Sequence, residues 1–87
     1  ADLAMIMALA SSFRDKPIPN DLTAIGEVGL TGELRSVSAL GQRLSEVRRM
    51  GFTKCLIPAR SSGTLSVPDG LQLIRVKNIR EALAAIL

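Results

Sequence analysis

Residues 40–50 carry apolar side chains at positions i, i+4, i+7 and i+10, namely Leu40, Leu44, Val47 and Met50. This spacing is typical of an amphipathic helix with one buried stripe. Ser38 is expected to cap the start of the helix, because its hydroxyl can accept a backbone hydrogen bond there. Gly51 suits the left-handed position just past the helix end.

Four strand-like segments flank this helix: residues 22–30, 33–37, 54–57 and 71–76. Thr31-Gly32 separates the first two as a tight turn, which predicts a β-hairpin. Pro58 closes the third strand, and polar residues 60–70 form a loop before the fourth. A helix that alternates with short strands predicts an α/β (α+β) fold with crossover connections.

Helices are also expected at both ends of the chain. Residues 1–14 are rich in Ala, Leu and Met, and they are apolar on nearly all sides, as in helices packed by protein on more than one side. Two prolines within residues 16–21 end this helix. Asn78 is expected to cap the last helix. The predicted order is helix, β-hairpin, helix, strand, strand, helix, and a chain of 87 residues is expected to be one domain or part of one.

Composition excludes several kinds of functional site. Histidine is absent, which removes imidazole zinc sites, Ser-His-Asp triads and Cys-His pairs. Cys55 is the single cysteine, so no disulfide can form within the chain, and without a histidine to activate it we expect a packing role. Tryptophan and tyrosine are absent, which argues against base-stacking platforms. Residues 1–13 are too short an apolar run to span a bilayer, so no membrane association is expected.

Three glycines are spaced as Gly26-x-x-Gly29-x-x-Gly32. Phosphate-binding loops need either G-x-G-x-x-G at a helix start or a Gly-Lys-Ser/Thr sequence, so close packing and a turn explain these glycines better. Glu27 and Glu33 lie on the two arms of the hairpin, where solvated or turn-bonding roles are favoured over acid/base catalysis. None of the lysines lies on the central helix, where a catalytic amine would be easiest to hold: Lys16, Lys54 and Lys77.

The net charge is +3, with arginine as the main cation. A modest excess of this kind permits nucleic-acid contact without requiring it. Five cations follow one another along the central helix and the strand after it. They form either a solvated face or a patch that contacts DNA phosphates without reading sequence. These candidate phosphate contacts are Arg43, Arg48, Arg49, Lys54 and Arg60.

Residues 26–35 (GEVGLTGELR) and residues 51–58 (GFTKCLIP) resemble the second half of the Lon-type proteolytic domain. In that family, a Gly-Gly-Leu-Lys type motif opens the intervening helix and carries the catalytic lysine. The corresponding segment is residues 38–43 (SALGQR), in which the lysine position falls on Gly41. The family's catalytic serine would lie upstream of Ala1. The resemblance implies part of a Lon-like α/β fold (ribosomal protein S5 domain 2-like) that is proteolytically inactive.

Within that superfamily, the chain is similar to the bacterial RadA/Sms family of DNA-repair proteins. The similarity covers essentially all 87 residues, and residues 10–17 (ASSFRDKP) are its most specific part. It implies a bacterial cytoplasmic protein with an N-terminal zinc finger and a RecA-like ATPase core, which performs ATP-driven branch migration along DNA. Zinc, ATP and Mg²⁺ would belong to that N-terminal part, and no cofactor is expected in this fragment. The Lon-like domain is implied to scaffold a hexameric ring and to contact DNA.

Residues 1–87 are therefore expected to be a fragment of a Lon-like C-terminal domain that acts as a non-catalytic scaffold and DNA-contact module. One alternative is a self-assembly element without an intrinsic ligand. It predicts dimers or larger species, because the apolar first helix and an open sheet edge would leave adhesive surfaces. A second alternative is a Lon-like serine peptidase, which would need a lysine at position 41.

Overall fold

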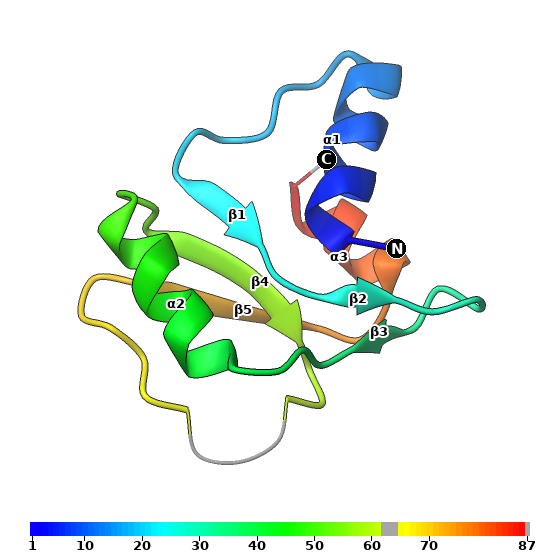
Figure 1. Cartoon of the computed structure of the whole chain (residues 1–87). Helices are drawn as coiled ribbons and strands as arrows, with labels where there is room; N and C mark the ends of the chain where they lie inside the picture. The colour runs from blue at the N-terminus through cyan, green and yellow to red at the C-terminus, as the bar shows by residue number, and fades with distance from the viewer. Residues whose placement is uncertain (62–64, 87) are drawn as a thin grey trace.

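A computed structural model of the chain describes residues 1–61 and 65–86 (Figure 1). In this part of the chain, three helices and five strands form a mixed α/β fold, which confirms the fold class expected from the sequence. The elements are α1 (Leu3–Arg14), β1 (Leu22–Ala24), β2 (Glu27–Val28), β3 (Leu34–Arg35), α2 (Leu40–Arg49), β4 (Lys54–Pro58), β5 (Gln72–Val76) and α3 (Ile79–Ile86).

The central sheet consists of three parallel strands in the order β1-β4-β5. Side chains alternate along β4, so Cys55 and Ile57 pack with the apolar side of α2, whereas Leu56 packs with α1 and α3. Helix α2 therefore covers one face of the sheet, and α1 and α3 cover the other (Figure 1). Burial on both faces is usual for parallel sheets, and it explains why β4 is a continuous apolar run.

The expected strand over residues 22–30 is in fact two strands that belong to different sheets. β1 pairs in parallel with β4, whereas β2 pairs antiparallel with β3. The chain leaves the central sheet at Ile25, whose N–H donates to the Leu56 carbonyl at 2.9 Å. Gly26 follows in a crowded position, because a Cβ there would lie 3.4 Å from both Leu3 and Pro58 side chains. The hairpin prediction is confirmed for β2 and β3 only.

The helix ends agree with the sequence at two positions and differ at a third. Gly51 has a φ of 101° just after α2, and Asn78 Oδ1 accepts a 2.9 Å hydrogen bond from the Glu81 N–H at the start of α3. The prediction of Ser38 as the cap of α2 was wrong. Ala39 occupies that position with a φ of 56°, and no side chain caps the helix there.

Helix α1 buries one side only. Leu3 and Met7 are buried in the core, while three large apolar side chains face outward: Met5, Leu9 and Phe13. The expectation that protein packs around more than one side of α1 is therefore not met within residues 1–61 and 65–86. No helix in these residues is long and apolar enough to cross a membrane.

Candidate nucleic-acid interface

The three arginines predicted as phosphate contacts on α2 point in three different directions. Helical residues are about 100° apart around the axis, which places Arg48 about 140° and Arg49 about 120° from Arg43. The buried side of α2, carrying Leu40 and Leu44, lies between Arg43 and Arg48. Arg43 and Arg48 thus flank the contact with the sheet on opposite sides, and Arg49 faces away from it. Helix α2 cannot present all three cations to one phosphate track.

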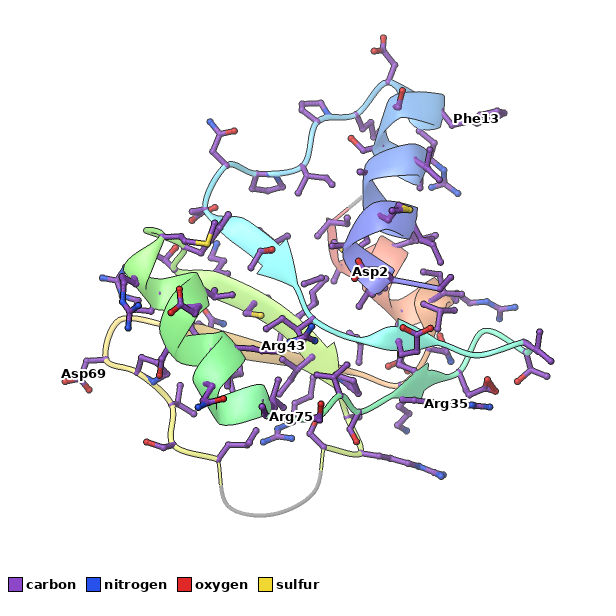
Figure 2. All side chains as sticks on the ribbon, viewed as in Figure 1. Asp2, Phe13, Arg35, Arg43, Asp69 and Arg75 are labelled. Carbon is purple, nitrogen blue, oxygen red and sulfur yellow. The ribbon has the colours of Figure 1, made fainter. Side chains whose placement is uncertain are left out.

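Arg48 is half-buried and makes hydrogen bonds to two other segments of the chain. Its Nε donates a 3.0 Å hydrogen bond to the Asp69 carbonyl, and its Nη1 donates a 3.3 Å bond to the Phe52 carbonyl. The guanidinium also packs against Gly70, where an added Cβ would lie 2.9 Å from Nε and Nη2. Asp69 lies in the loop that precedes β5 (Figure 2). Arg48 therefore fastens the end of α2 to that loop, and only part of its hydrogen-bonding capacity is left for a ligand.

The other predicted contacts are exposed but scattered. Arg49 Nη1 lies 2.6 Å from Glu46 Oε1 in an exposed ion pair. Arg43 belongs to α2 (Figure 2), and its side chain makes no hydrogen bond or ion pair with any described residue. Lys54 begins β4, and Arg60 lies beyond the other end of that strand. The strand is about 13 Å long, so these two cations lie at opposite edges of the sheet. The five predicted residues do not form one patch.

Arg60 instead lines the same surface as two cations that were not predicted as phosphate contacts. A hollow of about 730 Å³, here called the cationic hollow, lies at the carboxyl end of β4 and β5. Its cations are Arg35 from β3, Arg60 beyond β4 and Lys77 directly after β5. The remaining lining residues are Glu33, Leu34, Ser36 and Ala59.

Backbone hydrogen bonds bring these three segments together. The Ala59 N–H donates to the Val76 carbonyl at 2.8 Å, and the Leu34 N–H donates to the Lys77 carbonyl at 3.2 Å. The hairpin therefore joins the carboxyl edge of the parallel sheet, which is the edge where open α/β sheets bind ligands. Lys77 could have been found from the sequence, since it directly follows a predicted strand. Arg35 could not, because its place depends on the hairpin leaving the central sheet.

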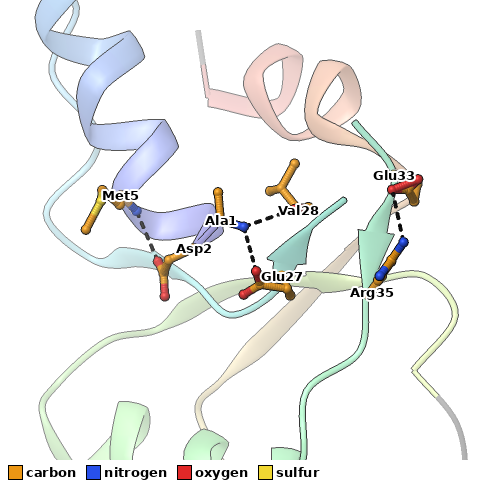
Figure 3. A network of polar contacts seen from close by, with 7 residues as sticks. All are labelled: Ala1, Asp2, Met5, Glu27, Val28, Glu33 and Arg35. Atoms are coloured by element: carbon orange, nitrogen blue, oxygen red, sulfur yellow. Dashed lines mark hydrogen bonds and ion pairs between the residues drawn. The ribbon is translucent and has the colours of Figure 1, made fainter. Parts of the chain in front are cut away.

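The cationic hollow has an excess of positive charge. Its lining includes three cations and one carboxylate, Glu33, and Glu33 Oε1 lies 3.8 Å from Arg35 Nη2 (Figure 3). The Thr31 hydroxyl donates to Glu33, and this bond, with a smaller contribution from Arg35, holds the pKa of Glu33 below its ordinary value of 4.5. Glu33 is ionised at neutral pH, which leaves a net charge of 3 − 1 = +2 among the lining residues. No ion pair within residues 1–61 and 65–86 involves Arg60 or Lys77.

The positions considered for catalysis have structural roles or open surroundings. Gly41 lies in the first turn of α2, and a Cβ built on it would meet no atom within 4 Å. Cys55 is fully buried, and burial raises the pKa of its thiol to about 11, which confirms the packing role. Gly29 lies under the Glu33 carboxylate, and Gly32 has a φ of 86° in the hairpin turn, so these glycines serve the turn as expected. Among residues 1–61 and 65–86, no three Cys, Asp or Glu side chains lie close enough together to hold a metal ion.

The comparisons with known proteins agree with this fold. The family model of the Lon protease (S16) C-terminal proteolytic domain matches residues 1–87. The chain belongs to that family. The resemblance expected from residues 26–35 and 51–58 is therefore confirmed.

Within this family, the chain is similar to proteins named DNA repair protein RadA. It is 43% identical over 84 residues to RadA of Escherichia coli and 48% identical over 83 residues to RadA of Bacillus subtilis, covering 97% and 94% of this chain. RadA of Streptococcus pneumoniae is 41% identical over 85 residues, or 98% of the chain. The matched regions amount to 18%, 18% and 20% of these relatives, so the chain spans about a fifth of their length. The resemblance to the RadA/Sms family is confirmed.

Proposed function

We propose that this chain is a non-catalytic scaffold and DNA-contact domain of a RadA-type protein that acts in ATP-dependent DNA repair and recombination by branch migration. The observation that carries the DNA contact is the cationic hollow, where Arg35, Arg60 and Lys77 converge on one surface. The similarity of the chain to proteins named for DNA repair supports DNA as the negatively charged partner of this surface. The parent protein would supply the ATPase, with ATP, Mg²⁺ and zinc bound outside these residues, in the cytoplasm.

Phosphate is the DNA group that the cationic hollow suits. Arg35 and Arg60 can each donate two parallel hydrogen bonds to a phosphate, and Lys77 adds a mobile point charge. All three side chains are exposed, so their charges are available to exchange counterions for DNA phosphates. Backbone contacts of this kind carry no sequence information, which suits a domain that must engage many DNA sequences.

The absence of catalysis is supported by Gly41. A Lon-like peptidase needs an amine at this position, and a glycine cannot supply one. No lysine side chain within residues 1–61 and 65–86 makes a hydrogen bond that would hold it as a replacement. Casein cleavage by a longer polypeptide containing this domain would contradict the proposal.

The DNA contact is tested with fluorescently labelled duplexes of two unrelated sequences, with binding followed by anisotropy at low salt. Equal affinity for both sequences is expected, together with clear weakening in the Arg60→Ala and Arg35→Ala variants. The Arg14→Ala variant is the matched control, because it removes the same charge from the exposed end of α1, outside the cationic hollow. Equal losses in all three variants would mean that net charge alone drives binding and would refute the hollow as the site.

The other predicted contacts remain part of the proposal as secondary ones. Arg43, Arg49 and Lys54 are exposed and could meet phosphates of a DNA that wraps beyond the hollow. Substitution of Arg48 would also remove two hydrogen bonds within the fold, so its effect on DNA binding must be measured on folded protein.

A further inference from the structure

The cationic hollow has the size of a pocket for a small group rather than that of a track for duplex DNA. Its volume is about 730 Å³, and pockets that enclose small ligands usually measure about 300–1,000 Å³. A DNA duplex presents its phosphates on a convex surface that is wider than such a pocket, since its major groove alone is about 12 Å wide. A phosphate within a duplex therefore reaches only the rim of the hollow, whereas a phosphate at the end of a strand can enter it.

The three cations of the hollow come from three different segments. Arg35 lies on β3, Arg60 lies in the turn after β4, and Lys77 directly follows β5. Figure 1 shows β3 beside the ends of β4 and β5, so these segments meet around the hollow. A phosphate at a strand end has three free oxygens that accept hydrogen bonds, one more than a phosphate that links two nucleotides. The arrangement therefore offers one cation to each oxygen of a terminal phosphate.

Hydrogen bonds order the two segments that carry Arg60 and Lys77. The Ser61 N–H donates to the Pro58 carbonyl at 3.1 Å, and Ser61 Oγ donates to the same carbonyl at 2.7 Å. On the other side of the hollow, the Lys77 N–H donates to Glu81 Oε1 at 2.8 Å. The backbone of both cations is thus held in place before a ligand binds, which reduces the conformational entropy that binding costs.

The charge of the hollow matches a dianion. With Glu33 ionised, the lining residues carry a net charge of +2. A phosphate within a strand carries one negative charge, whereas a terminal phosphate monoester carries about −1.5 to −2 at neutral pH. The monoester therefore neutralises the hollow, and a single internal phosphate leaves about one positive charge unbalanced.

We propose that the cationic hollow binds the terminal phosphate of a DNA strand in preference to phosphates within the strand. The inference rests on the proposed DNA contact and deepens it by naming the group that enters the hollow. Arg35 and Arg60 donate paired hydrogen bonds to the phosphate oxygens, and Lys77 supplies the third charge. The domain would thereby bind at DNA ends and nicks, where such phosphates are exposed, without reading sequence.

The inference is tested by fluorescence anisotropy on the 87-residue chain, with a DNA stem-loop that has one open end and a fluorophore in its loop. Three forms of this DNA differ only at the open end, which carries a 5′-phosphate, a 3′-phosphate or no phosphate. Wild type is expected to bind at least one phosphorylated form about tenfold more tightly than the unphosphorylated form, because an additional charge-assisted hydrogen bond is made. The two phosphorylated forms, compared with each other, show which strand end enters the hollow.

The ratio of these affinities is the readout specific to the hollow. Arg60→Ala and Lys77→Ala should each reduce the ratio severalfold, and neither side chain has a hydrogen-bond or ion-pair partner among the described residues whose loss would disturb the fold. Arg14→Ala is the matched control, because it removes one charge from the exposed end of α1. It should keep the ratio of wild type, since a change in net charge affects all three DNA forms alike.

A pH series adds a second readout. The ratio should shrink as the pH falls from about 7.5 to about 5.5, because a phosphate monoester takes up its second proton near pH 6. The charged side chains that line the hollow do not change over this range. Arg35, Arg60 and Lys77 stay protonated, and Glu33 stays ionised because its pKa is lowered.

Two results would overturn the inference: equal affinity of wild type for all three DNA forms, or a ratio that is unchanged in both Arg60→Ala and Lys77→Ala. Neither result would remove the proposed DNA contact if these variants still bind the unphosphorylated form more weakly than wild type does. Failure of wild type to bind any of the three forms would overturn both the inference and the DNA contact.

Discussion

Replacing Arg48 by alanine should destabilise the chain far more than the same change at its neighbour Arg49. Arg48 donates hydrogen bonds to the carbonyls of Asp69 and Phe52, at 3.0 and 3.3 Å, and it is half-buried. Arg49 forms only an exposed pair with Glu46. The two residues are adjacent on α2 and have the same charge and helix propensity, so their comparison isolates the contacts of Arg48.

The size of the effect follows from these contacts. A hydrogen bond with a charged donor is worth about 1.5–3 kcal/mol when buried, and partial exposure reduces this to about 1 kcal/mol for each bond of Arg48. Loss of both bonds should cost about 2 kcal/mol. In a domain of this size, that lowers the melting temperature by about 8–16 °C. The Arg49→Ala variant should change stability by less than about 0.5 kcal/mol, as is usual for exposed ion pairs.

Thermal unfolding followed by far-ultraviolet circular dichroism measures the difference, since the chain has no tryptophan or tyrosine for fluorescence. Arg48→Lys gives a further check. A lysine keeps the charge but cannot reproduce the guanidinium geometry, so an intermediate loss of about 1 kcal/mol is expected. If Arg48→Ala and Arg49→Ala melt at the same temperature, Arg48 does not fasten the loop before β5.

Three further predictions concern the hairpin, α2 and the core. Gly32→Ala should destabilise the chain by about 1–2 kcal/mol in urea unfolding, because a φ of 86° is unfavourable for a residue with a Cβ. Gly41→Ala, with open space around its Cβ, should instead stabilise it by about 0.5–1 kcal/mol. Glu33 has a lowered pKa in the folded state, so its contribution to stability is present above pH 4.5 and is lost as the pH falls through the lowered value. The melting temperature of Glu33→Gln should therefore fall less than that of wild type as the pH is lowered over this range. Equal falls would contradict the lowered pKa of Glu33. Cys55, with a pKa of about 11 and full burial, should react with a thiol reagent at pH 8 only in urea concentrations that unfold the chain, and fast labelling of folded protein would contradict this.

The elements with strong local patterns were predictable from the sequence. The apolar stripe of α2 follows from its helical periodicity, and β4 follows from a continuous apolar run. Gly51 marks a helix end because it tolerates a positive φ, and Asn78 marks a helix start because its side chain accepts a backbone hydrogen bond. These features depend on neighbours within a few residues in sequence. The start of α2 was less predictable, because Ala39 adopts a left-handed conformation that its residue type does not favour.

The division of residues 22–30 between two sheets was not predictable from periodicity. β1 and β2 both fit an extended pattern, and their separation depends on β1 pairing with β4, about 30 residues later in the chain. The place of Arg35 in the cationic hollow depends on the same long-range pairing, so Arg35 was not predictable, whereas Lys77 could have been selected as the residue directly after a predicted strand. Arg48 was selected from its charge alone, and its two hydrogen bonds became visible only with the loop before β5 in place.

The most direct test of the proposed DNA contact is the salt dependence of DNA affinity in wild type and in an Arg60→Ala/Lys77→Ala double variant. Each cation that neutralises a DNA phosphate contributes about 0.9 to the slope of log K against log salt. The double variant is therefore expected to lose about 1.8 from the slope and to bind more weakly at low salt, while Arg14→Ala, at the end of α1, keeps the wild-type slope. An unchanged slope and affinity in the double variant would show that the cationic hollow does not contact DNA.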